Sequence, residues 1–352
     1  MGFYSCKDFE RALDSGEIRI DSPKGIKISE ASVDVGLGNL YFKDPLARYE
    51  TSPFKEETFQ EYKNQFCKPL EFDGGYEVLP HRQTWIAESE ETVMIPNNIL
   101  KEVSSRSSAA RMFLKVDNAD DDFRAPRSCN RKKAYTGKVP MLFHTFGPGI
   151  KLYKGDRYAQ LFLHDLEGFL YGNGLKNALK RGEVKTAKNG KSAKEILLYR
   201  DGDAACGIML TLGEDIKLLK GSKIFDPKKD CSNYFEDFTL PHHSNVRFPK
   251  GTVFLASTAE KVGLSENYIG HLHDTFKPSF PSTLMVHPNA PYHNPGANGT
   301  LVLECHAYTD VGLKAGMPIV RMDIYRMNSP AEYCGRYAGQ NGIIESRAHL
   351  GL

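Results

Sequence analysis

Short apolar runs separated by turn residues dominate the pattern of hydrophobic and polar positions along the chain. The run at 319–325 has the two-residue period of a half-buried strand, because Val320, Met322 and Ile324 alternate with Arg321, Asp323 and Tyr325. Comparable runs lie at 252–256, 283–286 and 301–304, and Gly, Pro and Asn separate them. Helical patterns are fewer and cover 7–14, 174–181 and a single turn within 104–113. The pattern predicts a mostly β fold with a few short helices.

The pattern of the first half of the chain recurs in the second half. The segment RALDSGEIRI at 11–20 is echoed by NALKRGEVKT at 177–186, and WIAESEETVMIP at 85–96 is echoed by FLASTAEKVGLS at 254–265. Two more pairs keep the same order, 33–42 with 208–218 and 149–163 with 311–325. Recurrence in a constant order indicates a duplicated domain. We therefore expect two tandem β-barrel or jelly-roll domains, at 1–168 and 169–352.

The composition restricts the classes of partner. The 352 residues exceed the roughly 100–200 typical of one domain. With 46 basic and 44 acidic residues, the net charge is +2 and no basic stripe is present, so a nucleic-acid partner is not expected. Seven cysteines without a CxxC pair argue against disulfides and a Cys-rich zinc site, and predict reduced thiols in the cytoplasm. No apolar run is long enough to span a bilayer, so no membrane partner is expected.

The segment RSSAAR at 106–111 could bind an anion. Serine hydroxyls and free backbone N–H groups at the start of a helical turn, between the guanidinium groups of Arg106 and Arg111, make a compact cradle for a phosphate. The commoner structure for such a segment is a serine-capped surface helix with solvated arginines. These residues alone leave both interpretations open.

Two further segments carry candidate chemistry. Glu304 ends an otherwise apolar predicted strand in NPGANGTLVLECHAYTD, and burial there would raise its pKa and suit it to act as general base and acid. A glutamate on such a strand more often points to solvent. The C-terminal segment PAEYCGRYAGQNGI at 330–343 combines aromatic, basic and amide side chains with glycines, so it could close over a nucleotide. A disordered or merely packed terminus is the alternative.

Taken together, these segments resemble the dCTP deaminase and trimeric dUTPase family. Its RSSxAR motif is matched at 106–111, its LMVHxTA…DPGxxGxxxLE block by LMVHPNAPYHNPGANGTLVLE at 284–304, and its KYxxQxG tail by RYAGQNG at 336–342. The family's SSxDxRLG segment looks like ASVDVGLG at 31–38. The resemblance implies a dUTPase-like barrel in each half. It also implies zinc-independent hydrolytic deamination of dCTP to dUTP and ammonia.

Neither half matches the whole family pattern. In the second half, FKPSFP at 276–281 stands where RSSxAR should be, and in the first half Leu142 stands where the glutamate belongs. In the family the site lies between subunits, so the resemblance implies one composite site, with the cradle from the first half and the glutamate and tail from the second. Fused herpesvirus dUTPases look similar in distributing one site over two related domains. A monomer is therefore possible, and a homo-oligomer stays open.

The resemblance also implies a role for each residue. Glu304 would deprotonate a water that attacks C4 of cytosine and would then return the proton to the leaving ammonia. Ser107 would orient the water, and Arg111 would hold Glu304; because this charge lowers the pKa of the glutamate, burial has to outweigh it. Main-chain groups around Ala290 and Val302 would read the base edge. The remaining nucleotide ligands would be Arg106, Ser108, Asn294, Tyr333, Arg336, Tyr337 and Gln340, with Mg²⁺ held by the triphosphate and no metal ligand from the protein.

Two other functions stay open. A dUTP diphosphatase, or a bifunctional enzyme that takes dCTP to dUMP, needs an aspartate near the α-phosphate, and the matching position holds Asn294, whose amide cannot act as a base. The loop with Asp120, Asp121 and Asp122 does not align and could supply one. A non-catalytic nucleotide sensor would have lost the glutamate from both halves, so Glu304 argues against it.

Zinc chemistry is not expected. The zinc deaminases use an HxE motif with PCxxC, and PCxxC is absent from this sequence. His271 and His273 form an HxH pair, but no matching pattern of Cys or carboxylate ligands follows it. The pair belongs to the part of the second half where the family motif is lost.

Overall fold

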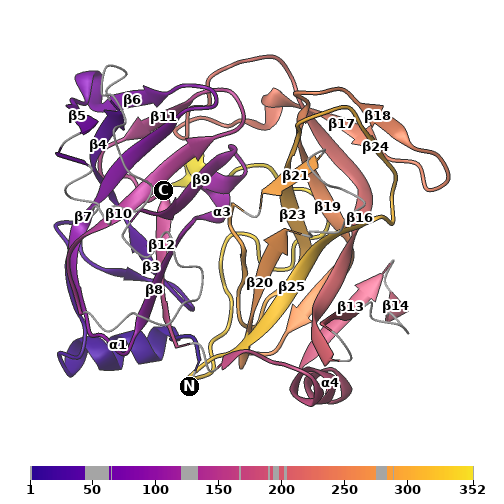
Figure 1. The fold of residues 1–352 in the computed structure, drawn as a ribbon, viewed down its shortest axis with the longest axis horizontal. Helices are drawn as coiled ribbons and strands as arrows, with labels where there is room; N and C mark the ends of the chain where they lie inside the picture. The colour runs from indigo at the N-terminus through magenta and orange to yellow at the C-terminus, as the bar shows by residue number, and fades with distance from the viewer. Residues whose placement is uncertain are drawn as a thin grey trace, which may run out of the picture.

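The computed structural model describes residues 2–43, 63–64, 66–119, 134–165, 168–188, 191–192, 198–201, 204–274, 284–287 and 289–351. The chain folds into two halves of curled sheets that lie side by side (Figure 1). The first half contains α1 (Cys6–Asp14), β1 (Arg19–Asp21), β2 (Lys27–Ile28), β3 (Val33–Val35), β4 (Leu37–Lys43), β5 (Cys67–Leu70), η1 (Asp73–Gly75), β6 (Tyr76–Leu79), β7 (Thr84–Ile95), β8 (Leu100–Ser105), α3 (Ser107–Ala110), β9 (Leu114–Asn118), β10 (Tyr135–Thr145), β11 (Ile150–Tyr153) and β12 (Ala159–His164).

The second half begins with a helix, as the first half does. It contains α4 (Asn173–Lys180), β13 (Val184–Lys188), β14 (Lys191–Ser192), β15 (Leu198–Asp201), β16 (Ala204–Leu219), η4 (Ser232–Tyr234), β17 (Phe235–Thr239), β18 (Val246–Phe248), β19 (Val253–Leu264), β20 (Tyr268–Asp274), β21 (Leu284–His287), β22 (Tyr292–His293), β23 (Asn298–Ala307), β24 (Val311–Leu313), β25 (Pro318–Arg326) and η5 (Ala348–Leu350). The prediction of a mostly β chain with a few short helices is confirmed. None of the helices in the described part of the chain combines the length and apolar character that a membrane crossing requires.

Corresponding strands pair in the same way in the two halves. The long strand β7 pairs with β1, β4 and β10, and the long strand β19 pairs with β13, β16 and β23. In each half the first helix leads directly into the short strand that pairs with the end of the long one, as a duplication would predict. Every sheet formed by the described residues takes its strands from one half. The boundary at 168/169 falls between β12 and α4 and stays a prediction.

Each helix begins where the sequence can cap it or bury one face. At α1, the side chain of Ser5 accepts from the main-chain N–H of Asp8 while the Asp8 carboxylate accepts from the N–H of Ser5, a reciprocal capping box. Phe9 and Ala12, one helical turn apart, are buried against the first sheet. The helices predicted at 7–14 and 174–181 are both present, with ends shifted by a residue.

The two halves join through a shared apolar region. The core of the first half includes Phe225 and Phe235 from the second half, and both rings lie 6.2 Å from the ring of Phe113, measured between centroids. Phe113 closes the turn that follows α3 and has a positive φ of 60°. This packing fixes the α3 segment against the second half, which is the position a composite site requires.

One face of β25 differs from its prediction. Val320, Met322 and Ile324 are fully buried, as the alternation indicated. The opposite face is only partly exposed: Asp323 is 2% exposed and lies against His273 of β20, whereas Arg321 and Tyr325 have intermediate exposure. The alternation correctly predicts a strand but cannot show that a side chain of the neighbouring strand β20 packs against Asp323.

Candidate active site

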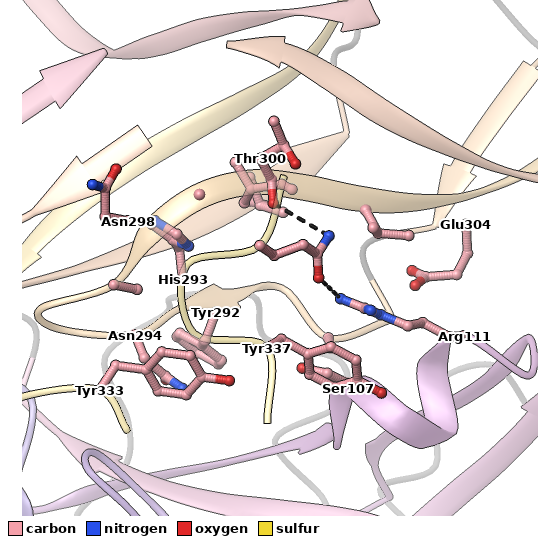
Figure 2. Close-up of a pocket in the computed structure, with 17 residues that line it drawn as sticks. Ser107, Arg111, Tyr292, His293, Asn294, Asn298, Thr300, Glu304, Tyr333 and Tyr337 are labelled. Carbon is pink, nitrogen blue, oxygen red and sulfur yellow. Dashed lines mark hydrogen bonds between the residues drawn. The ribbon is translucent and has the colours of Figure 1, made fainter. Parts of the chain in front are cut away.

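A pocket lies between the two halves, beside α3 and strands β22 and β23 (Figure 2). Ser107 and Arg111 reach it from the first half, and Glu304 reaches it from β23 of the second half. The other residues that line it all belong to the second half: Leu272, Ala290, Tyr292, His293, Asn294, Ala297, Asn298, Gly299, Thr300, Leu301, Val302, Tyr333, Tyr337 and Gln340. The structure therefore brings the predicted cradle, glutamate and tail together within one chain.

Glu304 lies inside β23, which continues to Ala307, and not at the end of a strand as its run of apolar residues suggested. It is 3% exposed, because β19 and β21 flank it on both sides. Burial raises the pKa of this carboxyl to about 8, and the charge of Arg111 and the main-chain N–H groups of Glu304 and Asn289 lower it only in part. The carboxyl can therefore exchange a proton near neutral pH.

Arg111 binds the tail and does not pair with the glutamate. Its guanidinium donates to the side-chain oxygen of Gln340 at 2.8 Å and to the main-chain oxygen of Ile344, and lies 3.6 Å from the centroid of the Tyr337 ring. Among the ion pairs of the described residues, none joins Arg111 to Glu304. The predicted role of holding Glu304 is thus limited to the electrostatic effect of Arg111 on its pKa.

Ser107 and Ser108 have different environments within the α3 turn. Ser107 is the first helical residue and lines the pocket. Ser108 is buried, and its hydroxyl lies 3.0 Å from the hydroxyl of Tyr337. Its carbonyl accepts from the hydroxyl of Ser346 at 2.6 Å. Ser108 therefore holds the tail against the first half and does not line the pocket.

Two predicted phosphate ligands, Arg106 and Arg336, also lie outside the pocket lining. The guanidinium of Arg106 is 3.4 Å from the carboxylate of Asp34 and donates to the carbonyl of Arg157. Arg336 donates to the carbonyls of Arg347 and Leu350, each at 3.2 Å. Carboxylate and carbonyl oxygens of the protein therefore bind both guanidinium groups in this structure. Burial, with a smaller contribution from the charges of Arg336 and Arg157, lowers the pKa of Arg106.

The C-terminal tail closes the pocket. It leaves the second half after β25 and returns to the first half, where the C-terminus lies beside α3 and β9 (Figure 1). On the way, the carbonyl of Gln340 accepts from the N–H of Thr300. The side-chain amide of Gln340 donates to the carbonyl of Thr300 and accepts from the guanidinium of Arg111, two residues that Figure 2 labels. The cavity that remains measures about 80 Å³, below the roughly 300–1,000 Å³ of typical ligand pockets. In this arrangement the tail leaves less space than a typical ligand pocket offers.

The sequence interpretation missed several pocket residues in the block at 284–304, most clearly Tyr292, His293, Asn298 and Thr300. His293 is a neutral ring: burial lowers its pKa to about 4, and its Nε2 lies 3.0 Å from the carbonyl of Val262. The signal was available, because Ala290, Asn294 and Val302 were predicted in the same block. Treating the whole block as a hairpin would have included them.

His271 and His273 join the two halves of the molecule. The Nε2 atoms of His271 and His164 each lie 3.6 Å from a carboxylate oxygen of Glu102, which belongs to the first half. His271 Nδ1 is 2.8 Å from His273 Nε2, which is 3.1 Å from Asp323. Within the described ranges, no group of three or more His, Cys, Asp or Glu side chains is arranged to hold a metal ion. Residues 120–122 and 276–281, on which two expectations rested, lie outside those ranges.

The mostly β fold in two halves agrees with the predicted fold class, and the solved deaminase structure described below, which superimposes on 93% of this chain, confirms a dUTPase-like fold. The family model described as dCTP deaminase-like matches residues 3–166 and 181–327. The chain therefore belongs to the dCTP deaminase-like family.

Curated relatives and a solved structure agree with this assignment. The chain is 30% identical over 152 residues to "dCTP deaminase, dUMP-forming" of Salinispora arenicola, which covers 38% of this chain and 78% of the relative. It is 35% identical over 114 residues to "dCTP deaminase" of Actinobacillus pleuropneumoniae, which covers 31% of this chain and 59% of the relative. The structure of a 2'-deoxycytidine 5'-triphosphate deaminase from Agrobacterium tumefaciens superimposes with a TM-score of 0.74 at 15% identity, over 93% of this chain and 99% of that one. At this identity the likeness concerns the fold.

Proposed function

We propose that this protein is a hydrolytic deaminase that converts dCTP and water to dUTP and ammonia. The observation that carries the proposal is the carboxyl of Glu304, which is buried in the pocket between the halves and has a pKa raised to about 8. The names of its relatives support the substrate, because those described above are deaminases of dCTP.

The chemistry needs one group that both takes and returns a proton. The carboxylate of Glu304 removes a proton from a water, and the resulting hydroxide attacks C4 of the cytosine ring. The carboxylic acid then returns the proton to the amino nitrogen, which leaves as ammonia while C4 becomes a carbonyl. Ser107, across the pocket from β23, orients the water. Main-chain groups of Ala290 and Val302 read the edge of the base.

The pocket favours dUTP over dUMP as the product. Glu304 is the only carboxylate among the described residues that line it. Asn294 lines the pocket where diphosphate hydrolysis needs an aspartate, and an amide cannot accept the proton of a water. One of the relatives above is named dUMP-forming and the other name states no product, so the residue at this position, and not family membership, supports the assignment.

The triphosphate would lie near the guanidinium groups of Arg106, Arg111 and Arg336. Arg106 and Arg336 lie close enough for the charge of one to affect the pKa of the other. Because the described lining residues offer no second carboxylate, a Mg²⁺ ion would enter with the nucleotide, held by phosphate oxygens and water. Tyr333, Tyr337 and Gln340 would then close over the nucleotide with the tail. The cytoplasm and a homo-oligomeric state stay predictions.

Product analysis tests the proposal. The purified protein is incubated with dCTP and Mg²⁺, and the nucleotides are separated by ion-exchange chromatography, with Glu304→Gln as the matched control. Equal release of dUTP and ammonia, lost in the control, supports the deaminase. Formation of dUMP and pyrophosphate would instead indicate the bifunctional enzyme. Binding of dCTP without turnover would indicate a non-catalytic nucleotide sensor.

A further inference from the structure

Asn289 touches both Glu304 and the α3 turn of the other half. It follows β21, is 1% exposed, and donates its main-chain N–H to the carboxyl of Glu304. Its side-chain Nδ2 lies 3.5 Å from the carbonyl oxygen of Ala110, next to Arg111. Its Oδ1 has no hydrogen-bond partner in the structure. The roles proposed above give this residue no function.

The orientation of the Asn289 amide follows from its contact. If Oδ1 and Nδ2 were exchanged, two oxygens would face each other at the Ala110 carbonyl, so Nδ2 belongs there and Oδ1 points away from it. Buried polar side-chain atoms usually have a partner, and an exception asks for an explanation. Here the unpaired atom belongs to the residue whose own N–H binds the glutamate.

The two groups that Asn289 contacts have to keep a fixed separation during catalysis. Glu304 belongs to the second half, and Ser107 and Arg111 belong to the first, so relative motion of the halves would change the distance between base and cradle. A misplacement of about 1 Å can reduce a rate by roughly 100-fold. The family pattern has Thr where this chain has Asn289, and the longer amide carries its donor and its acceptor on separate atoms.

We propose that Asn289 is a positioning residue for Glu304, whose side chain links the glutamate to the α3 turn of the other half. The main-chain N–H orients the carboxyl, and Nδ2 sets the distance to Ala110. This inference rests on the proposed function, because the positioned carboxyl is the proposed base.

The chain offers a matched control for this residue. Asn118 on β9 also has Nδ2 3.5 Å from a main-chain carbonyl, that of Lys101, and its Oδ1 is also buried and unpaired. It does not line the pocket. Asn118→Ala therefore removes the same kind of contact without touching Glu304.

The test compares the steady-state kinetics of dCTP deamination in Asn289→Ala, Asn289→Asp and Asn118→Ala. Asn289→Ala should lower kcat roughly 10- to 100-fold and change KM by less than about threefold, because the catalytic geometry and not binding is lost. Asn289→Asp should move the midpoint of the pH profile upward, because a second carboxylate disfavours ionisation of Glu304. Asn118→Ala should leave both quantities unchanged.

Two kinetic results would overturn the inference. One is a kcat and pH midpoint of Asn289→Ala equal to those of the wild type, and the other is an equal loss in Asn118→Ala, which would show a general effect on folding. A crystal structure of Asn289→Ala gives a readout that needs no turnover: the Glu304 carboxyl should move relative to Ala110. An unmoved carboxyl would refute the positioning role even if dCTP proved not to be a substrate, an outcome that would refute the proposed function separately.

Discussion

The rate of deamination should rise with pH through a midpoint near 8. Burial raises the pKa of Glu304 to about 8, and the proposed base acts as the carboxylate. At pH 7 about one-tenth of the free enzyme would carry the carboxylate, and at pH 9 about nine-tenths would. The value of kcat/KM for dCTP should therefore increase roughly tenfold between these two pH values.

The assay measures initial rates of ammonia release at dCTP concentrations below KM, at constant ionic strength and excess Mg²⁺. Glu304→Gln serves as the control at every pH, because it keeps the shape of the side chain and removes the titrating group. A profile that is flat from pH 6 upward would mean that the base titrates near the ordinary pKa of a glutamate. That result would refute the argument that burial controls the proton transfer.

Three further predictions concern stability and closure. Glu304→Gln should be more stable than the wild type at pH 9, by roughly 5 kcal/mol, and about equally stable at pH 4. A raised pKa in the folded state gives stability that is lost as pH rises through about 8, as urea unfolding at both pH values would show. Tyr337→Phe removes hydrogen bonds to the hydroxyl of Ser108 and to the N–H of Arg347, so the closed position of the tail should lose about 1–2 kcal/mol of stability. The KM for dCTP should then rise roughly 5- to 30-fold, whereas the exposed control Tyr171→Phe should leave it unchanged. Glu102→Gln should lower the melting temperature at pH 6, because two histidines hold the pKa of Glu102 well below its ordinary value. The difference in melting temperature between variant and wild type should shrink at lower pH, where acid protonates the wild-type carboxylate, and a constant difference would contradict this reasoning.

Local features of the fold could be predicted from the sequence because they depend on near neighbours. The helix at 7–14 is capped within its own first turn by Ser5 and Asp8, and the strand at 319–325 shows its buried face by alternation. The internal repeat predicted that two similar halves would combine. Their relative placement rests on aromatic packing around Phe113, between residues more than 100 positions apart, which no local pattern encodes.

The candidate site could be predicted only in part, because a sequence motif identifies residues but does not show where their side chains point. Glu304 and Ser107 lie where a composite site needs them. Arg111, Arg106 and Arg336 were predicted to face the glutamate or phosphates, but each guanidinium binds protein oxygens. Those bound by Arg111 and Arg106 come from segments distant in sequence, and those bound by Arg336 come from the end of the same tail. Asn289 could not be identified from the sequence, because its proposed role depends on a side-chain contact between the two halves.

The central claim is that both halves of one chain build one deaminase site. Ser107→Ala in the first half and Glu304→Gln in the second should each abolish most of the deamination of dCTP by the wild-type protein. The decisive measurement is the activity of the two variants after they are mixed, unfolded and refolded together. We predict no recovery of deaminase activity, because no chain in the mixture contains a complete site. Recovery toward a quarter of the wild-type activity, as expected when residues combine between chains, would contradict it.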